Sequence, residues 1–183
     1  DKNVNVSVKA TRALYAFAVI AKAKGKTEAV TYFDSLAHDR AAELEKRFPN
    51  HLPLSFDSGE DTYSLKYNLA ADKMLGSNLF DQKLLEREVD LYISKLNKFG
   101  CPLDSRKAFT KSDWLMWVAA LTENDEKRKK MITPLTKFLT DSPKRVPYSD
   151  WYDTVTGEVP MFRNRTVQGG LYVLPLLDKK TGN

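Results

Sequence analysis

Four aspartates in two polar, aromatic-rich segments are the residues of this chain best suited to hydrolytic chemistry. Asp104 and Asp113 stand in one segment, and Asp150 and Asp153 stand in a second. Paired carboxylates can act as general acid and general base in amide hydrolysis, and glycoside hydrolysis also uses two of them. We predict Asp104 and Asp150 as the acid/base pair and Asp113 as a further catalytic candidate. A helix cap or an ion pair is the alternative, and for any one aspartate taken alone it is favoured.

Basic and aromatic side chains in the same region could hold a substrate. Arg106, Lys111 and Arg163 are predicted to bind a substrate carboxylate, because the planar fork of an arginine matches a carboxylate with two hydrogen bonds. Trp151 and Asp153 complete the predicted substrate-binding set. Tryptophans are more often part of a core, but an exposed Trp151 beside Asp150 would favour stacking on a sugar.

The segment that carries the first two aspartates is predicted to end in a helix start. Pro102 fixes its own φ angle and favours extended backbone before it. Thr110 or Ser112 is predicted as the N-cap, which places Asp113 in the first turn, where the helix dipole favours a carboxylate. Such a helix start can bind an anion or a polar substrate, although capping alone explains most of its residues.

The elements that must position these side chains are mostly helices, and the predicted fold class is mainly α. We expect antiparallel helix hairpins that form part of an (α/α) toroid, with a short β-hairpin and long loops. The expected helices cover residues 6–24, 27–48, 66–75, 82–99 and 125–139, with a further helix around Trp114. Residues 51–56 and 62–65 are expected to form a short β-hairpin or an extended loop between helices. Pro134 is expected to kink the last of these helices.

Composition narrows the classes of function. The chain has 183 residues and a net charge of +5. It contains one cysteine and two histidines, so we expect no internal disulfide, no metal and no cofactor. The basic run 127–130 lacks interleaved aromatic residues, so it predicts a solvated helix face and no nucleic-acid partner. We find no secretory signal or membrane-spanning run, and expect no membrane partner. Sequons at Asn5 and Asn164 predict glycosylation.

Several uncommon motifs resemble the C-terminal region of the fungal and bacterial glutaminase A-like proteins. They follow in the order of that family: Lys66-Tyr67-Asn68-Leu69 with Asp72-Lys73, Asn78-Leu79-Phe80, Pro102-Leu103-Asp104-Ser105-Arg106, Thr110-Lys111-Ser112-Asp113-Trp114, Ser149-Asp150-Trp151-Tyr152-Asp153-Thr154 and Gly169-Gly170-Leu171. The resemblance implies a six-hairpin toroid of the glycosidase-like class, secreted or associated with the cell wall. It also implies a hydrolase that converts L-glutamine to L-glutamate and ammonia.

Three departures from the family pattern shape the remaining expectations. Family members are much larger, Tyr63 stands where tryptophan is usual, and residues 163–166 replace an Arg-Ala-Arg-Pro pattern. We therefore expect residues 1–183 to be one helical domain, the C-terminal part of a larger, processed protein that begins here without an initiator methionine. The missing N-terminal part, or self-association, would then cover an apolar edge. The alternative functions are a non-catalytic, lectin-like carbohydrate-binding protein and a glycoside hydrolase on the same fold.

Overall fold

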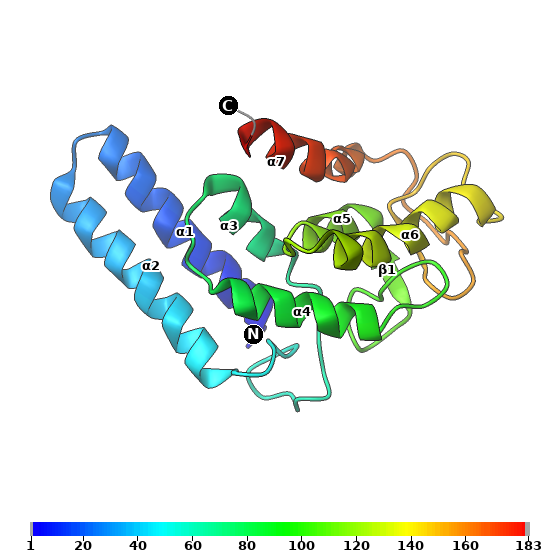
Figure 1. The fold of residues 1–183 in the computed structure, drawn as a ribbon, viewed down its shortest axis with the longest axis horizontal. Helices are drawn as coiled ribbons and strands as arrows, with labels where there is room; N and C mark the ends of the chain where they lie inside the picture. The colour runs from blue at the N-terminus through cyan, green and yellow to red at the C-terminus, as the bar shows by residue number, and fades with distance from the viewer. Residues whose placement is uncertain (1, 182–183) are drawn as a thin grey trace.

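The molecule begins with a long antiparallel helix hairpin, as its sequence predicts. The computed structural model describes residues 2–181, and in it α1 (Val4–Ala23) turns at Gly25 into α2 (Thr27–Arg47). Asn3 caps α1, because its side chain accepts a hydrogen bond from the Val6 amide, and Gly25 takes a φ of 65° in the turn. Figure 1 shows this hairpin at one end of the molecule.

Small side chains allow the two helices of this hairpin to approach closely. Ala18 and Ala21 of α1 and Ala37 and Ala41 of α2 are all buried. Among the described residues, α1 is the one helix that is long and apolar enough to cross a membrane by length and composition. Only 33% of this apolar stretch is buried, and its buried side chains, among them Val4 and Val8, join the core.

The middle of the chain forms two shorter helices after a 3₁₀ turn. The turn η1 (Tyr67–Leu69) runs into α3 (Ala70–Leu75), and α4 (Gln82–Ser94) is capped by Asp81. Arg12 of α1 forms an ion pair with Asp72 of α3 at 3.2 Å, which ties the hairpin to the body of the molecule. The prediction that α4 continues to residue 99 is wrong, because residues 97 and 100 pair in a tight turn.

The two strands of the structure lie elsewhere than predicted. β1 (Phe109–Lys111) pairs antiparallel with β2 (Trp151–Asp153), with Thr110 opposite Tyr152. Residues 51–65 form no hairpin, so that prediction is wrong, and its alternative of an extended loop holds. Their backbone instead pairs with distant segments: Ser55 bridges to Asn3, and Ser64 bridges to Asp104. Burial does not alternate along this segment: Leu52 and Pro53 are both buried, and so are Tyr63, Ser64 and Leu65.

The remaining helices complete a fold that is mainly α, as predicted, with a small antiparallel sheet. α5 (Ser112–Ala119) and α6 (Asp125–Asp141) follow β1, and α6 includes Pro134. A second 3₁₀ stretch, η2 (Thr166–Tyr172), packs on α5 and leads into α7 (Val173–Thr181). Figure 1 shows α5, α6 and β1 together, at the end of the molecule opposite the hairpin.

A buried polar network fixes the irregular segment 50–66 against α4. The Lys66 ammonium donates to the carbonyls of Leu52 at 2.8 Å and Ser64 at 3.0 Å, and to the Ser64 hydroxyl at 2.9 Å. Glu88 accepts from the Leu52 amide and from the Tyr92 hydroxyl, each at 2.5 Å. Burial lowers the pKa of Lys66 to about 8, although the charges of Glu88 and Asp104 oppose the shift.

Candidate functional site

The loop that carries Asp104 is held on both sides by backbone hydrogen bonds. The Leu65 amide donates to the Leu103 carbonyl at 2.8 Å, and the Leu103 amide donates to the Phe109 carbonyl at 2.8 Å. The loop thus lies between the start of η1 and the strand β1. Asp104 itself pairs with Ser64 as an isolated bridge. This tertiary support gives a loop without regular structure a defined position.

Arg106 closes over the Asp104 carboxylate. Asp104 Oδ1 accepts from the Arg106 amide at 2.9 Å and from its Nε at 3.0 Å, and Oδ2 accepts from Nη2 at 2.7 Å. The Asp104 side chain is 5% exposed, whereas that of Arg106 is 69% exposed. The guanidinium therefore has a face free to meet a ligand while its edge holds the carboxylate. The hydrogen bonds that Arg106 donates to the Asp104 carboxylate also raise the pKa of Arg106.

Three hollows border this aspartate–arginine pair. The widest, of about 570 Å³, is the most open and lies beside Tyr63 and residues 94–97 and 105–108. The other two have stacked aromatic walls, and the larger of them, of about 340 Å³, is bounded by the pair and by Leu103, Lys107, Phe109 and Trp151. The smaller, of about 270 Å³, is bounded by Asn3, Asn5, Val6, Lys9, Leu54, Ser64, Leu65, Tyr67, Asn68, Leu103, Trp114 and the same pair. Asp104 and Arg106 are thus the predicted site residues with direct access to open space on two sides.

Aromatic pairs form a wall in each of these two hollows. Tyr67 stacks on Trp114 in the smaller hollow, with ring centroids 3.8 Å apart and an interplanar angle of 18°. Phe109 stacks on Trp151 in the larger one at 5.2 Å and 16°. Burial raises the pKa of Tyr67. Flat aromatic faces beside a carboxylate suit a polar ligand with an apolar face, such as an aliphatic chain or a sugar.

A second cluster of predicted residues surrounds Asp150 at the junction of β1 and α5. Asp150 is fully buried, and it forms ion pairs with Lys111 at 3.2 Å and with Arg165. Burial by itself would raise the pKa of Asp150, but the bonds from Arg165 and Lys111 outweigh it and lower that pKa. Lys111 also lies 5.0 Å from the centre of the Trp114 ring, so this aromatic side chain stands between the two clusters.

Asp113 is buried beside this second cluster. It lies in the first turn of α5, and its Oδ1 has no hydrogen-bond partner among the described residues. The pKa of Asp113 is raised overall. Burial is the main cause and the Asp150 charge adds to it, while the Lys111 charge opposes the shift. The predicted N-cap is wrong: Thr110 lies in β1, Lys111 takes the cap position without a side-chain bond, and Ser112 accepts from the Tyr148 hydroxyl instead.

The other predicted site residues hold the surrounding loops. Asp153 Oδ1 accepts from the amides of Val155 at 2.8 Å and Thr156 at 2.9 Å, which closes a turn after β2. Arg163 donates to the carbonyls of Lys144 at 3.3 Å and Pro147 at 3.1 Å. The structure brings neither side chain into the two hollows.

The two sequons differ in their surroundings. Asn5 lines the smaller hollow, where its Oδ1 accepts from Asn68 at 3.2 Å and its Nδ2 donates to the Leu65 carbonyl at 3.5 Å. Asn164 is exposed in a turn, with a φ of 56°.

Sequence reasoning missed three contributors to the site. Arg165 holds Asp150, Tyr67 forms the stacked wall with Trp114, and Lys9 of α1 lines the smaller hollow. Arg165 stands two positions from Arg163 in one motif, so spacing could not tell which arginine turns toward Asp150. In the described part of the chain, no group of three or more metal-ligating side chains is present.

The fold and this site together define a helical-hairpin domain with an aspartate–arginine centre between aromatic walls. The chain belongs to the glutaminase A six helical-hairpin domain family, whose family model matches residues 1–175. It is 32% identical to glutaminase A of Aspergillus oryzae over 182 residues, which cover 94% of this chain and 26% of that protein. It is 23% identical to a probable glutaminase of Arthroderma benhamiae over 209 residues, which cover 96% of this chain and 24% of that protein.

The chain thus spans about a quarter of the length of the curated relatives that it matches. The family model covers both aspartate clusters, so the family assignment applies to the fold up to residue 175.

Proposed function

We propose that this chain forms part of the substrate site of an amidohydrolase that converts L-glutamine to L-glutamate and ammonia. The family and the printed names of the two relatives support the reaction class. The observation that carries the location is the Asp104–Arg106 pair, which opens onto two hollows with aromatic walls. The rest of a complete site would come from parts of the protein outside these 183 residues.

Each group at this site has a role that follows from its charge and access. The cations Arg106 and Lys9 hold the substrate carboxylate, and the Tyr67–Trp114 stack bounds its aliphatic chain. Asp104 accepts a proton from the water that adds to the carboxamide carbon. The carbon–nitrogen bond then breaks, and the nitrogen leaves as ammonia after it receives a proton.

Asp150 and Asp113 support this chemistry from the second cluster. Asp150 positions Lys111 and Arg165, which places positive charge behind the Trp114 wall. Asp113, with its raised pKa, keeps a proton to a higher pH than an ordinary aspartate. A proton donor for the leaving ammonia needs this property; because Asp113 lines neither hollow, it is a supporting proton-handling candidate without direct contact to the leaving group.

The proposal is tested by ammonia release from L-glutamine with the full-length protein. Asp104→Asn should lower kcat by about 10²-fold or more while the melting temperature stays close to that of the wild type. Arg106→Lys should mainly raise KM, since lysine cannot form the same fork. Asp39→Asn, an exposed aspartate on α2, is the matched control and should keep full activity. Undiminished turnover in Asp104→Asn would rule out this site.

Carbohydrate binding is a second candidate function, supported by one observation. Trp151 and Phe109 present a stacked aromatic surface to the larger hollow, beside Asp104, Arg106 and Lys107. Aromatic faces next to polar groups are suited to sugar rings. A glycan array probed with the wild type and with Trp151→Ala tests this function, which requires binding that the substitution removes. Glutamine turnover without any glycan binding would exclude it.

A secreted or cell-wall location is also proposed, because both sequons are compatible with passage through a glycosylating compartment. The exposed Asn164 supports this more directly than Asn5, whose amide lies in the smaller hollow.

A further inference from the structure

One four-residue pattern, a Lys-Arg pair followed by an apolar residue and a proline, occurs twice in this chain. It covers residues 46–49, where Phe48 precedes the proline, and residues 144–147, where Val146 does. The basic pair is exposed in both copies. Endoproteases that cut after paired basic residues bind the two cations through acidic pockets, so the sequence alone offers both copies as cleavage sites.

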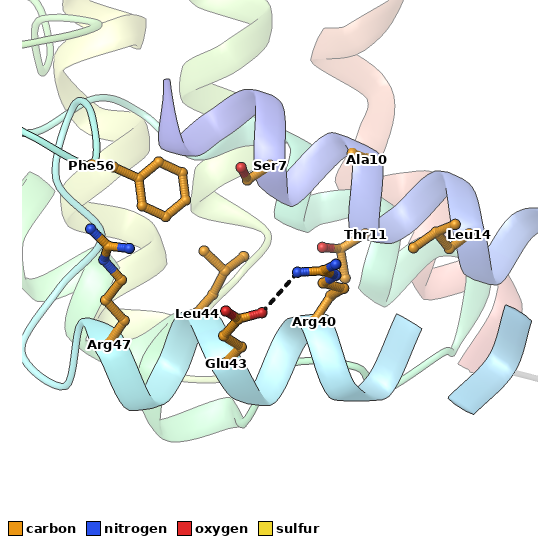
Figure 2. Close-up of a pocket in the computed structure, with 9 residues that line it drawn as sticks. All are labelled: Ser7, Ala10, Thr11, Leu14, Arg40, Glu43, Leu44, Arg47 and Phe56. Carbon is orange, nitrogen blue, oxygen red and sulfur yellow. Dashed lines mark hydrogen bonds and ion pairs between the residues drawn. The ribbon is translucent and has the colours of Figure 1, made fainter. Parts of the chain in front are cut away.

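The first copy belongs to a helix. Arg47 ends the last turn of α2, and the Phe48 amide donates to the Leu44 carbonyl at 3.0 Å. The Arg47 guanidinium lies 4.8 Å from the centre of the Phe56 ring. Figure 2 shows the Arg47 side chain reaching from this end of α2 toward Phe56, beside the groove between α1 and α2. An extended peptide-binding cleft cannot take up this backbone until the helix turn unwinds.

The second copy lies in an exposed loop between α6 and β2. Residues 142–147 form neither a helix nor a strand, and residues 143–147 are all exposed. Val146 is 82% exposed, and no large apolar side chain in the described part of the chain is more exposed. Lys144 pairs with Glu158 at 2.8 Å, but both side chains are about half exposed, so this ion pair is easily broken. Exposed loop tips of this kind are the preferred sites of proteolytic nicking.

The two ends of this loop are anchored to the body of the domain. The Ser142 hydroxyl donates to the Gly157 carbonyl at 2.6 Å. The Arg163 guanidinium donates to the carbonyls of Lys144 at 3.3 Å and Pro147 at 3.1 Å, one on each side of the bond that follows the basic pair. The segments before and after that bond therefore keep their own contacts with the fold when the bond is cut.

We propose that the Arg145–Val146 peptide bond is a processing site for an endoprotease specific for paired basic residues. Water adds to the carbonyl carbon of Arg145, and the carbon–nitrogen bond breaks. The products are a carboxylate on Arg145 and an ammonium group on Val146, so the protein gains the mass of one water molecule. The proposal depends neither on the proposed activity nor on the proposed location.

The cut protein remains one particle, because its two pieces share a core and an ion pair. Tyr152, after the cut, is fully buried and stacks on Phe138, before the cut, with ring centroids 3.6 Å apart. β2 keeps its antiparallel pairing with β1 across the two pieces. Asp150 keeps its ion pair with Lys111 at 3.2 Å. The cut thus places Asp104 and Asp150 on separate pieces without moving the two aspartate clusters apart.

The test is digestion of the full-length protein with a purified kexin-type protease, which cuts after paired basic residues. New N-termini are labelled and measured by mass spectrometry. We expect the Val146 terminus to appear about tenfold or more faster than the Phe48 terminus, because cleavage of the helical copy waits for local unfolding. Arg145→Gln should abolish the Val146 terminus, and Arg47→Gln is the matched control and should leave its rate unchanged.

Two synthetic peptides, residues 42–51 and 140–149, separate the effect of the fold from that of the sequence. They should be cut at similar rates, since both contain the same pattern. Equal rates at the two copies in the folded protein would overturn the proposal. It would also fail if no Val146 terminus formed while the peptides were cut, because another part of the protein would then cover the loop.

Size-exclusion chromatography of the digest tests whether the pieces stay together. They should elute at the volume of the uncut protein and separate only in denaturant. Separation under native conditions would contradict the single particle. Peptides that differ in rate as much as the two copies in the protein would assign the selectivity to sequence and overturn the argument from the fold.

Discussion

Replacement of Lys66 by methionine should destabilise the fold by an amount that grows as the pH rises. The ammonium is fully buried and makes three hydrogen bonds, two to carbonyls and one to a hydroxyl. Methionine has a similar length but no donor, so it leaves the carbonyls of Leu52 and Ser64 without this partner. A buried polar group left unpaired costs about 1–3 kcal/mol, and loss of a nearby cation adds the cost of an uncompensated Glu88.

These losses are offset by removal of a charge that is itself costly to bury. The pKa of Lys66 falls from 10.5 to about 8, and a difference of 2.5 pKa units corresponds to about 3 kcal/mol. The cost of the unpaired carbonyls and of the uncompensated Glu88 exceeds the gain from charge removal. We therefore expect a net loss of about 3 kcal/mol at pH 7.

The sign of the pH dependence follows from proton binding. Between pH 8 and 10.5 the unfolded chain keeps the proton on Lys66 while the folded chain has lost it. The unfolded state binds more protons there, so this group makes the wild type more stable as the pH rises through this window. Lys66→Met lacks the group, and the stability difference between wild type and variant should widen by up to about 3 kcal/mol.

Urea unfolding at pH 7, 8, 9 and 10, followed by circular dichroism, measures both effects. Lys46→Met, at an exposed position near the end of α2, is the control and should change the stability by less than about 0.5 kcal/mol at each pH. A loss below about 1 kcal/mol at pH 7, or a difference that shrinks with rising pH, would refute the reasoning about the buried ammonium.

Three further predictions concern the site and its supports. Asp113→Asn should leave the fold as stable or more stable near neutral pH, because the raised pKa means that the buried charge is unfavourable. Glutamine turnover by the full-length protein should fall. Unchanged turnover would remove Asp113 from the proton-handling residues. Glu86 bonds to Lys127, Thr122 and the Glu123 amide, and despite the opposing effect of burial these bonds lower its pKa to about 2. Glu86→Gln should cost about 1–2 kcal/mol at neutral pH, and the cost should fade as the pH drops from 4.5 towards 2, as acid-induced unfolding monitored by fluorescence would show; a constant cost would contradict the pairing. Mass spectrometry of the protein from a eukaryotic host should find a glycan on Asn164 in higher occupancy than on Asn5; the reverse order would mean that the smaller hollow is open when the sugar is added.

Local patterns were enough to predict the helices but not the strands. The apolar stripes and the glycine after α1 depend on neighbours three to eight positions away, so they can be recognised in the sequence. β1 and β2 are three residues long each and lie about forty positions apart, so no local pattern links them. Residues 51–65 alternate in sequence, but their backbone pairs only through single bridges to distant residues, which a local pattern does not reveal.

The sequence by itself determined a mainly helical fold and offered acidic, basic and aromatic residues as candidates for a site. It could not determine their partners, because each pairing joins segments that are distant along the chain. The tertiary structure decided that Arg106 holds Asp104 and that Arg165 rather than Arg163 holds Asp150. It also decided that the Lys66 ammonium is buried within reach of the Glu88 charge. Burial and charge pairing set the chemistry of these groups, and both arise only when the helices and loops pack together.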